Sequence, residues 1–291
     1  MRALLALVAV TAVWGVTFVQ VKDAVALYPL FAFLAVRFAI ASCTLAVPGV
    51  RRLRSLGRRG TRAAIVAGGL IGAGYALQTA GLERSSVSST GFITGMSVVL
   101  TPVLALLLFR VRAARAAWVG VLLATAGLAL LAGVHRGSAL GDLLVLAGAA
   151  VYALQIVLME RYAPRYDAIA FTLVEMLAAF GGLLAIAAAR GELSLPRGWT
   201  VWGALAVTGI FASALAFLVQ TWAQRRASAT QTALAFSLEP VWTAFFGFTL
   251  AGDRLGALAW SGCVVILAGI VIAEPSTADV LYRLVRRPRA A

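Results

Sequence analysis

Long apolar runs without a charged residue constrain the fold of this sequence more than any other feature. Residues 63–82, 85–109 and 116–134 contain no Asp, Glu, Lys or Arg. A helix needs about 20 apolar residues to cross the hydrocarbon core of a bilayer. Because the runs are continuously apolar, without alternation of polar and apolar residues, they favour helices over the strands of a membrane barrel. The sequence therefore predicts an all-α integral membrane protein.

Ten segments are long and apolar enough to cross a membrane. They are 3–21, 30–48, 62–82, 88–109, 116–134, 140–159, 168–189, 200–224, 229–250 and 256–273. The chain is 62% hydrophobic and only 12% charged, which is too little charge to cover the surface of a soluble domain. Residues Met1–Phe18 resemble a signal peptide, with a basic start and an apolar run. We expect them to remain as the first span, because they take part in the internal repeat described below.

The basic residues predict the orientation of these spans. If the N-terminus lies in the cytoplasm, eighteen Lys and Arg residues lie on the cytoplasmic side, six lie outside, and Arg37 lies within a span. The positive-inside rule favours this arrangement, which requires an even number of spans and a cytoplasmic C-terminus. The net charge of +14 does not indicate a nucleic-acid partner, because the basic residues form short clusters between apolar runs. We expect a monomeric multi-pass protein of the cell inner membrane, with the lipid bilayer as its surroundings.

Little in the sequence points to enzyme or metal chemistry. Cys43 and Cys263 lie far apart within apolar runs, and the single histidine, His135, lies in a loop. No metalloprotease, phosphate-binding or nucleophile-elbow motif is present. We therefore expect no cofactor, no metal site and no catalytic residues.

The two halves of the chain resemble each other when residue numbers are shifted by 142, or by 138 near the start of each half. The matches are Trp14 with Tyr152, Phe33 with Phe171, Arg37 with Glu175, Gln78-Thr79 with Gln220-Thr221, Trp118 with Trp260, Gly120 with Gly262, and Ala126-Gly127 with Ala268-Gly269. We predict one five-helix repeat over residues 1–137, a second over 138–275, and a basic cytoplasmic tail over 276–291. Because five is odd, the second repeat enters the membrane inverted, a design that recurs in secondary transporters.

The fourth and ninth spans carry matching prolines and polar stripes. Pro102 and Pro240 differ by 138 in a region aligned at 142, which predicts helix breaks displaced by one turn between the halves. The polar stripe of the fourth span lies on one helix face, and a shift of 142 places its counterpart on the same face of the ninth span. The two sets are Thr90, Thr94, Ser97 and Thr101, and Thr232, Phe236, Glu239 and Thr243. Such residues suit either a cavity lining or the packing of helices against one another.

Three charged residues lie inside spans, where each is costly and marks a candidate functional site. Arg37 and Glu175 are predicted at heights that differ by about 6 Å, which an arginine side chain could bridge as an ion pair. This pair could stabilise the fold or gate a pathway. Glu239 lies beside Pro240 near the middle of its span, with no obvious basic partner. It is the preferred site for protonation or for binding a substrate amine.

Aromatic and amide side chains near the membrane midplane complete the predicted site. Aromatic faces beside amide groups suit a flat, partly polar ligand, or a cation held over the rings. The predicted cavity residues are Trp14, Phe18, Tyr75, Gln78, Thr94, Ser97, Tyr152, Gln155, Gln220, Glu239 and Trp242.

The repeat, the number of spans and the segment Leu238-Glu239-Pro240 resemble the EamA-type ten-helix branch of the drug/metabolite transporter superfamily, over nearly the whole chain. The segment Thr90-Gly91-Phe92-Ile93-Thr94-Gly95, followed by Pro102, is most similar to the YddG-type aromatic amino-acid exporters. This resemblance implies a proton- or gradient-linked exporter with a central cavity among spans 1–4 and 6–9. It also implies that spans 5 and 10 are peripheral. The sequence departs from symmetry at Glu239, whose first-half equivalent is Ser97.

We therefore expect a secondary transporter that exports amino acids or similar small metabolites by alternating access, with proton coupling as one possibility. An extruder of organic cations is the first alternative, and a passive channel is the second. A lipid-modifying enzyme would require a nucleophile or a metal set that the sequence does not offer.

Overall fold

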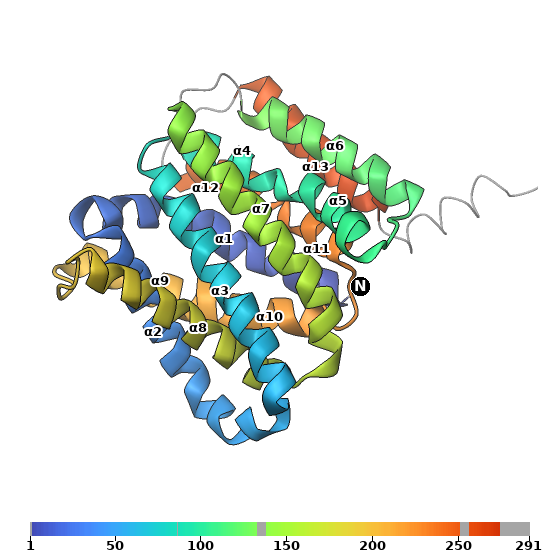
Figure 1. Cartoon of the computed structure of the whole chain (residues 1–291). Coiled ribbons are helices and arrows are strands. Elements are labelled where there is room, and N and C mark those ends of the chain that lie inside the picture. The colour runs from blue at the N-terminus through green and yellow to red at the C-terminus, as the bar shows by residue number, and fades with distance from the viewer. Residues whose placement is uncertain (1, 86, 133–137, 251–255, 274–291) are drawn as a thin grey trace, which may run out of the picture.

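The computed structural model describes residues 2–85, 87–132, 138–250 and 256–273 (Figure 1). All regular secondary structure in these ranges is helical. The helices are α1 (Arg2–Leu27), α2 (Leu30–Gly49), η1 (Val50–Leu56), α3 (Gly57–Leu82), α4 (Val87–Gly95), α5 (Ser97–Phe109), α6 (Arg115–Ala132), α7 (Ala139–Tyr162), η2 (Ala163–Arg165), α8 (Ala168–Ala189), α9 (Trp199–Gly209), η3 (Ile210–Leu215), α10 (Ala216–Ala223), α11 (Ala229–Phe236), α12 (Glu239–Leu250) and α13 (Ala257–Ala273). His135 and the predicted basic tail over 276–291 lie outside the described residues.

Six helical stretches among the described residues are long and apolar enough to cross a membrane. They are Arg2–Leu27, Leu30–Leu82, Thr90–Phe109, Ala139–Arg165, Ala168–Ala189 and Trp199–Ala223, and shorter apolar helices cover Arg115–Leu130 and Ala257–Ala273. Large apolar side chains such as Leu122 and Val264 are 68% and 65% exposed on the outside of the bundle, as a lipid environment allows. The protein is thus an all-helical, multi-pass membrane protein. The stretch Leu30–Leu82 contains both α2 and α3, so the number of ten crossings stays a prediction.

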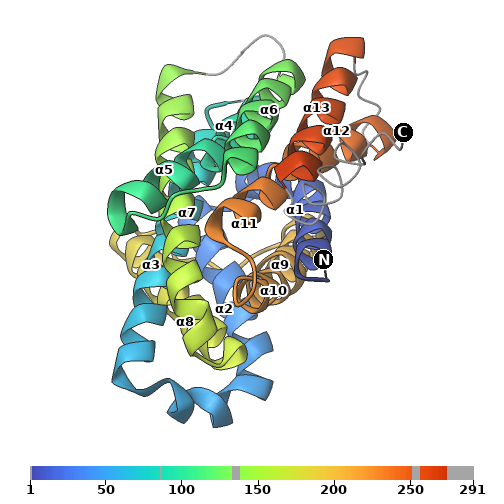
Figure 2. The same ribbon diagram turned by 90° about the vertical axis from the view of Figure 1, so that its right-hand side faces the viewer.

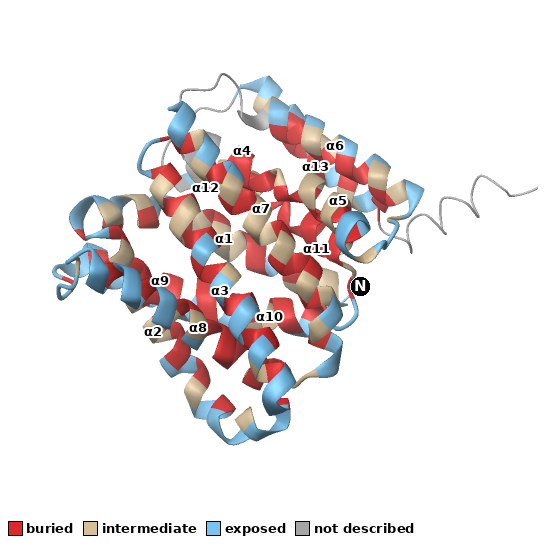
Figure 3. Cartoon of the chain, viewed as in Figure 1, coloured by how far each residue is buried: buried red, intermediate tan, exposed pale blue. Residues whose placement is uncertain are grey.

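The buried residues lie toward the middle of the bundle, and the exposed residues lie toward its outside (Figure 3). Buried residues line the inward parts of α3, α7 and α11, whereas the connection between α2 and α3 is mostly exposed. The core therefore lies among the central helices, and the α2–α3 connection faces outward.

The helix breaks in the fourth and ninth expected spans lie at equivalent positions. Met96 alone separates α4 from α5, and Ser237 and Leu238 separate α11 from α12. A shift of 142 places Met96 on Leu238, so the predicted displacement by one turn is wrong. Pro102 lies inside α5 and marks no break. Pro240 occupies the first turn of α12, where backbone N–H groups have no acceptor within the helix, so a proline there costs no hydrogen bond.

The eighth expected span contains a π-helical turn, η3, that the sequence did not predict. It is continuous with α9 and α10 and widens the helix at Ile210–Leu215. Such turns release backbone carbonyls from regular pairing and occur often at functional sites. Here the Ala212 carbonyl oxygen accepts hydrogen bonds from two side chains far away in the sequence, Trp14 and Arg37.

Helices α6 and α13 lie side by side at one edge of the bundle (Figures 1 and 2). Their contact is built on glycines. A Cβ added to Gly120 would meet the Gly269 carbonyl oxygen at 2.6 Å, and one added to Gly127 would meet the Gly262 carbonyl oxygen at 2.6 Å. Only residues without a side chain allow two membrane helices to approach this closely.

Two further glycines hold helices close at the buried charges. A Cβ on Gly68 of α3 would lie 2.2 Å from the Glu175 carbonyl oxygen of α8. A Cβ on Gly209 of α9 would lie 3.0 Å from the Arg37 carbonyl oxygen of α2. The α3–α8 and α2–α9 crossings therefore place both charged residues in the tightly packed interior.

Candidate functional site

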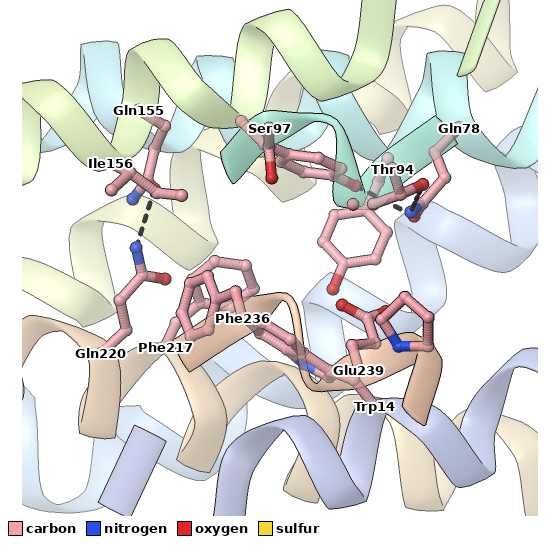
Figure 4. Close-up of a pocket in the computed structure, with 14 residues that line it drawn as sticks. Trp14, Gln78, Thr94, Ser97, Gln155, Ile156, Phe217, Gln220, Phe236 and Glu239 are labelled. Carbon is pink, nitrogen blue, oxygen red and sulfur yellow. Dashed lines mark hydrogen bonds between the residues drawn. The ribbon is translucent and has the colours of Figure 1, made fainter. Parts of the chain in front are cut away.

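A cavity lies where the two helix breaks face each other in the centre of the bundle (Figure 4). We call it the main cavity. Its lining residues are Trp14, Tyr75, Gln78, Thr94, Gly95, Ser97, Tyr152, Gln155, Ile156, Phe217, Gln220, Phe236, Glu239 and Pro240. Its volume is about 50 Å³, which holds a few water molecules, whereas ligand pockets usually measure roughly 300–1,000 Å³. A metabolite therefore requires these helices to separate.

A second cavity, the Arg37 cavity, adjoins the main cavity. It has a volume of about 30 Å³ and is lined by Trp14, Thr17, Phe18, Val21, Arg37, Tyr75, Gln78, Thr79, Leu82 and Glu239. Trp14, Tyr75, Gln78 and Glu239 belong to both linings. The two spaces therefore share walls and form a single candidate site.

The aromatic residues of the site contact one another at right angles or in tilted pairs. The Trp14 ring lies 4.8 Å from Phe236 and 5.9 Å from Phe217 between ring centroids. Tyr75 and Tyr152 meet edge to face at 5.6 Å. The Trp14 Nε1–H donates to the Ala212 carbonyl at 2.8 Å, which fixes the indole against the π-helical turn. The result is an apolar wall with polar groups at its edges, as in many small-molecule sites.

Amide side chains occupy the two ends of the main cavity (Figure 4). At one end the Gln78 amide donates to the Thr94 hydroxyl at 2.9 Å and accepts from the Tyr152 hydroxyl at 3.1 Å. At the other end the Gln220 amide donates to Gln155 at 2.9 Å. The Gln220 Oε1 atom is buried without a hydrogen-bond partner among the described residues. An unpaired acceptor beside a cavity is available to a polar ligand.

Arg37 does not form the predicted ion pair with Glu175. Its Nε–H donates to the Ser213 hydroxyl at 2.8 Å, and its Nη2 donates to the Tyr75 hydroxyl at 3.1 Å and the Ala212 carbonyl at 3.4 Å. The guanidinium carbon also lies 4.3 Å from the centre of the Tyr75 ring. The prediction was wrong because the height of a residue along its helix does not specify the side on which its side chain projects.

Glu175 lies instead in a closed polar network. Its Oε1 accepts a long hydrogen bond from Gln155 at 3.4 Å, and its Oε2 accepts one from Thr221 at 3.3 Å. Thr172 and Thr221 join the network through a hydroxyl contact of 2.9 Å. Glu175 is fully buried and lines neither cavity. Its hydrogen-bond partner Gln155 lines the main cavity, and its partner Thr221 also donates to the carbonyl of Phe217.

Glu239 lines both cavities and is only partly buried. Arg37, which shares the Arg37 cavity with it, attracts its carboxylate electrostatically. Glu239 therefore has a basic counterpart across the cavity, which corrects the sequence-based expectation that it had none. Both residues are described, and no N–O distance of 4.0 Å or less joins them.

The predicted cavity residues lie in the lining of one cavity or the other, with Trp242 as the exception. Trp242 packs against Gly15 of α1 and stacks on Phe246 at 6.1 Å between centroids. Sequence reasoning missed Phe217 and Ile156 in the main cavity, and Thr17, Val21 and Leu82 in the Arg37 cavity. Phe217 lies three residues before Gln220 on α10, so the helix face already assigned to Gln220 could have identified it.

Comparisons with known proteins agree with this architecture. A family model described as "EamA-like transporter family" matches the chain twice, over residues 1–133 and 139–273. An uncharacterized transporter of Archaeoglobus fulgidus is 30% identical over 92% of this chain and 84% of its own length. The uncharacterized transporter YyaM of Bacillus subtilis is 26% identical over 68% of each chain. A solved crystal structure has a TM-score of 0.79 with 19% identity, over 96% of this chain and 98% of its own, and so shows similarity of fold alone.

Proposed function

The chain belongs to the EamA-like transporter family, and we propose that it is a secondary carrier that exports small amphipathic molecules across the inner membrane. Amino acids with apolar or aromatic side chains are the cargo that the site favours. The observation that carries this proposal is the central cavity, in which the rings of Trp14, Phe217 and Phe236 face amide groups and the Glu239 carboxylate. The similarity of the Thr90–Gly95 segment to aromatic amino-acid exporters supports the same cargo.

An inverted repeat of two five-helix units supports a carrier mechanism. The family model matches each half of the chain separately. The α6–α13 contact also has the symmetry that such a repeat requires, because a shift of 142 converts the Gly120–Gly269 pair into the Gly262–Gly127 pair. In this proposal ten helices cross the membrane, both termini are cytoplasmic, and the site lies where the two units meet.

The position of the cavity supports alternating access. A cluster of buried apolar residues lies between the main cavity and the predicted cytoplasmic ends of α1, α7 and α10. Its members include Leu7, Val10, Ile156, Ala223 and Phe236. On the other side, the Arg37 cavity extends past Val21 and Leu82, toward the predicted outer ends of α1 and α3. We propose that this conformation is closed to the cytoplasm and that separation of the apolar cluster opens it.

Exchange across liposome membranes tests this function. The full-length chain is reconstituted, the liposomes are loaded with unlabelled L-phenylalanine, and the entry of labelled L-phenylalanine is followed. A carrier gives saturable entry that internal substrate accelerates, relative to protein-free liposomes. A passive channel gives entry that neither saturates nor responds to internal substrate, and that result would exclude the carrier mechanism.

Extrusion of organic cations is the second candidate function. It is favoured by one observation, the Glu239 carboxylate beside the rings of Trp14 and Tyr75, which together suit a cation. The same liposomes, tested with labelled methyl viologen, separate the two cargo classes. A pH-sensitive dye inside the liposomes tests proton coupling, since a coupled exporter moves protons only when its substrate is present.

A further inference from the structure

Arg37 and Glu239 bring opposite charges to one cavity without forming an ion pair. Both residues line the Arg37 cavity, and no N–O contact within 4.0 Å joins them. A charge held away from water needs a complementary partner. Two opposite charges that face the same space, but do not touch, together complement a ligand that carries both signs.

The surroundings of Arg37 leave part of its guanidinium group toward this space. Its Nε and Nη2 atoms donate to Ser213, Tyr75 and the Ala212 carbonyl. Its Nη1 atom makes no hydrogen bond with the described residues, although only 2% of the residue is exposed. A rigidly held guanidinium group with free N–H donors is suited to a carboxylate, to which arginine donates strong charge-assisted hydrogen bonds.

The order of groups along the joined cavities narrows the choice of ligand. Arg37 lines only the Arg37 cavity, and Glu239 lines both cavities. Phe217 and Phe236 line only the main cavity. Both charged groups therefore lie at the Arg37 cavity, and the rings of Phe217 and Phe236 lie on the main-cavity side of Glu239. An α-amino acid carries its carboxylate, ammonium group and side chain on one carbon, so the two charged groups can meet Arg37 and Glu239 while the side chain extends into the main cavity.

We propose that Arg37 binds the carboxylate and Glu239 the ammonium group of a zwitterionic amino acid, whose apolar side chain lies against Phe217 and Phe236. This inference rests on the proposed function and decides between its two cargo classes. A ligand with an ammonium group alone is attracted by Glu239 and repelled by Arg37. A ligand with a carboxylate alone meets the reverse. Each half-ligand should therefore bind at least about tenfold more weakly than the zwitterion, since hydrogen bonds to charged groups are among the stronger ones.

Competition for L-phenylalanine exchange tests the assignment. Liposomes that contain the full-length chain exchange labelled L-phenylalanine in the presence of unlabelled L-phenylalanine, 2-phenylethylamine, which lacks the carboxylate, or 3-phenylpropionate, which lacks the ammonium group. In the native protein each half-ligand should require at least about tenfold higher concentration for half-inhibition. In Arg37→Gln the half-inhibition concentration of the amine should come to within about threefold of that of L-phenylalanine. In Glu239→Gln it is instead the half-inhibition concentration of the acid that should approach that of L-phenylalanine.

Arg37→Gln should change selectivity against the amine, and Glu239→Gln should change selectivity against the acid. This opposite response separates a binding role from a structural one, because a merely destabilised protein binds all three ligands more weakly by the same factor. Trp199 is 91% exposed and lines neither cavity, so Trp199→Phe should leave both ratios of half-inhibition concentrations unchanged. If Arg37→Gln does not fold, Ser213→Ala serves in its place, because it removes one acceptor of Arg37 while keeping the charge. It should lower the ratio of the half-inhibition concentrations of the amine and L-phenylalanine by about threefold and leave the ratio for the acid unchanged.

Four results would overturn the inference. Equal competition by the amine and L-phenylalanine in the native protein would exclude a role for Arg37 in binding the carboxylate. If both variants changed the half-inhibition ratios for the amine and the acid equally, Arg37 and Glu239 could not be assigned to separate groups of the ligand. Saturable exchange of methyl viologen without exchange of L-phenylalanine would overturn the zwitterion site but leave the carrier function intact. The absence of saturable exchange for every labelled compound would overturn the carrier function as well.

Discussion

Arg37 and Glu175 occupy corresponding positions in the two halves of the chain, and their backbones are packed in the same way. Each lies beside a glycine of a crossing helix, Gly209 for Arg37 and Gly68 for Glu175. Their side chains differ sharply. Arg37 lines the same cavity as Glu239, whereas Glu175 accepts hydrogen bonds from Gln155 and Thr221 and lines neither of the two cavities described above.

This difference shows that depth in the membrane does not by itself make a charge functional. A buried charge whose hydrogen bonds are satisfied by neighbours stabilises one arrangement of the helices. A buried charge that lines a cavity has hydrogen-bonding groups that protein neighbours do not satisfy, and these groups are available to a ligand. We expect Glu175 to belong to the first class and the Arg37–Glu239 pair to the second, and substitutions at these residues and at their glycine crossings can distinguish the two classes.

The largest effect is expected at the α3–α8 crossing. In Gly68→Ala the new Cβ would lie 2.2 Å from the Glu175 carbonyl oxygen, and backbone cannot move aside as a flexible side chain can. Overpacking of this kind typically costs about 1–3 kcal/mol or more, so we expect roughly a tenfold loss of folded protein in detergent extracts. Gly69→Ala is the matched control, because a Cβ there meets no atom within 4 Å.

Gly209→Ala extends the same test to the Arg37 crossing. Its Cβ would lie 2.8 Å from a methyl group of Ile40 and 3.0 Å from the Arg37 carbonyl oxygen, so the clash is milder. We expect a loss of folded protein of about threefold, between those of Gly68→Ala and Gly69→Ala. Size-exclusion chromatography of equal membrane amounts measures all three variants. A greater loss for Gly209→Ala than for Gly68→Ala would show that the two crossings do not differ as described.

A second comparison sets Glu239→Gln against Glu175→Gln. Loss of the charge at Glu239 should reduce L-phenylalanine exchange per folded molecule by about tenfold, because a charge-assisted contact to the cargo disappears. Glutamine at 175 keeps the shape of the side chain and can still hydrogen-bond to Gln155 and Thr221. Exchange by Glu175→Gln should therefore stay within about threefold of the native rate. The reverse ranking of the two variants would make Glu175, and not Glu239, the functional carboxyl group.

Trp14→Phe tests the aromatic wall that the Arg37–Glu239 pair shares. The substitution keeps a ring in the cavity but removes the hydrogen bond from Nε1 to the Ala212 carbonyl. A neutral hydrogen bond contributes about 0.5–1.5 kcal/mol, so exchange should fall by roughly two- to tenfold. Trp199→Phe is the control at an exposed tryptophan. If the two variants exchange substrate at equal rates, the contact with the π-helical turn has no role in transport.

Hydropathy predicted the helical membrane fold because burial in lipid constrains every residue of a span. The repeat offset also related the helix breaks at Met96 and Leu238, although the prolines suggested other positions. The partners of Arg37 could not be predicted, since they depend on the π-helical turn, which places the Ala212 carbonyl and Ser213 beside it. That turn has no local signal in the sequence. It is accompanied instead by contacts with α1 and α2, which are distant along the chain.

The smallest effect is expected at Ser97, the first-half counterpart of Glu239. Ser97 lines the main cavity, and among the described contacts it is the Ser97 carbonyl, not the hydroxyl, that accepts a hydrogen bond, from Thr101. Ser97→Ala should therefore keep the helix break and leave exchange within about twofold of the native rate. Ser97→Glu sharpens the test by placing a carboxyl group at both equivalent breaks. If transport needs one carboxylate opposite one guanidinium group, this variant should bind 2-phenylethylamine more tightly relative to L-phenylalanine. An unchanged preference would mean that the two breaks do not face the same substrate.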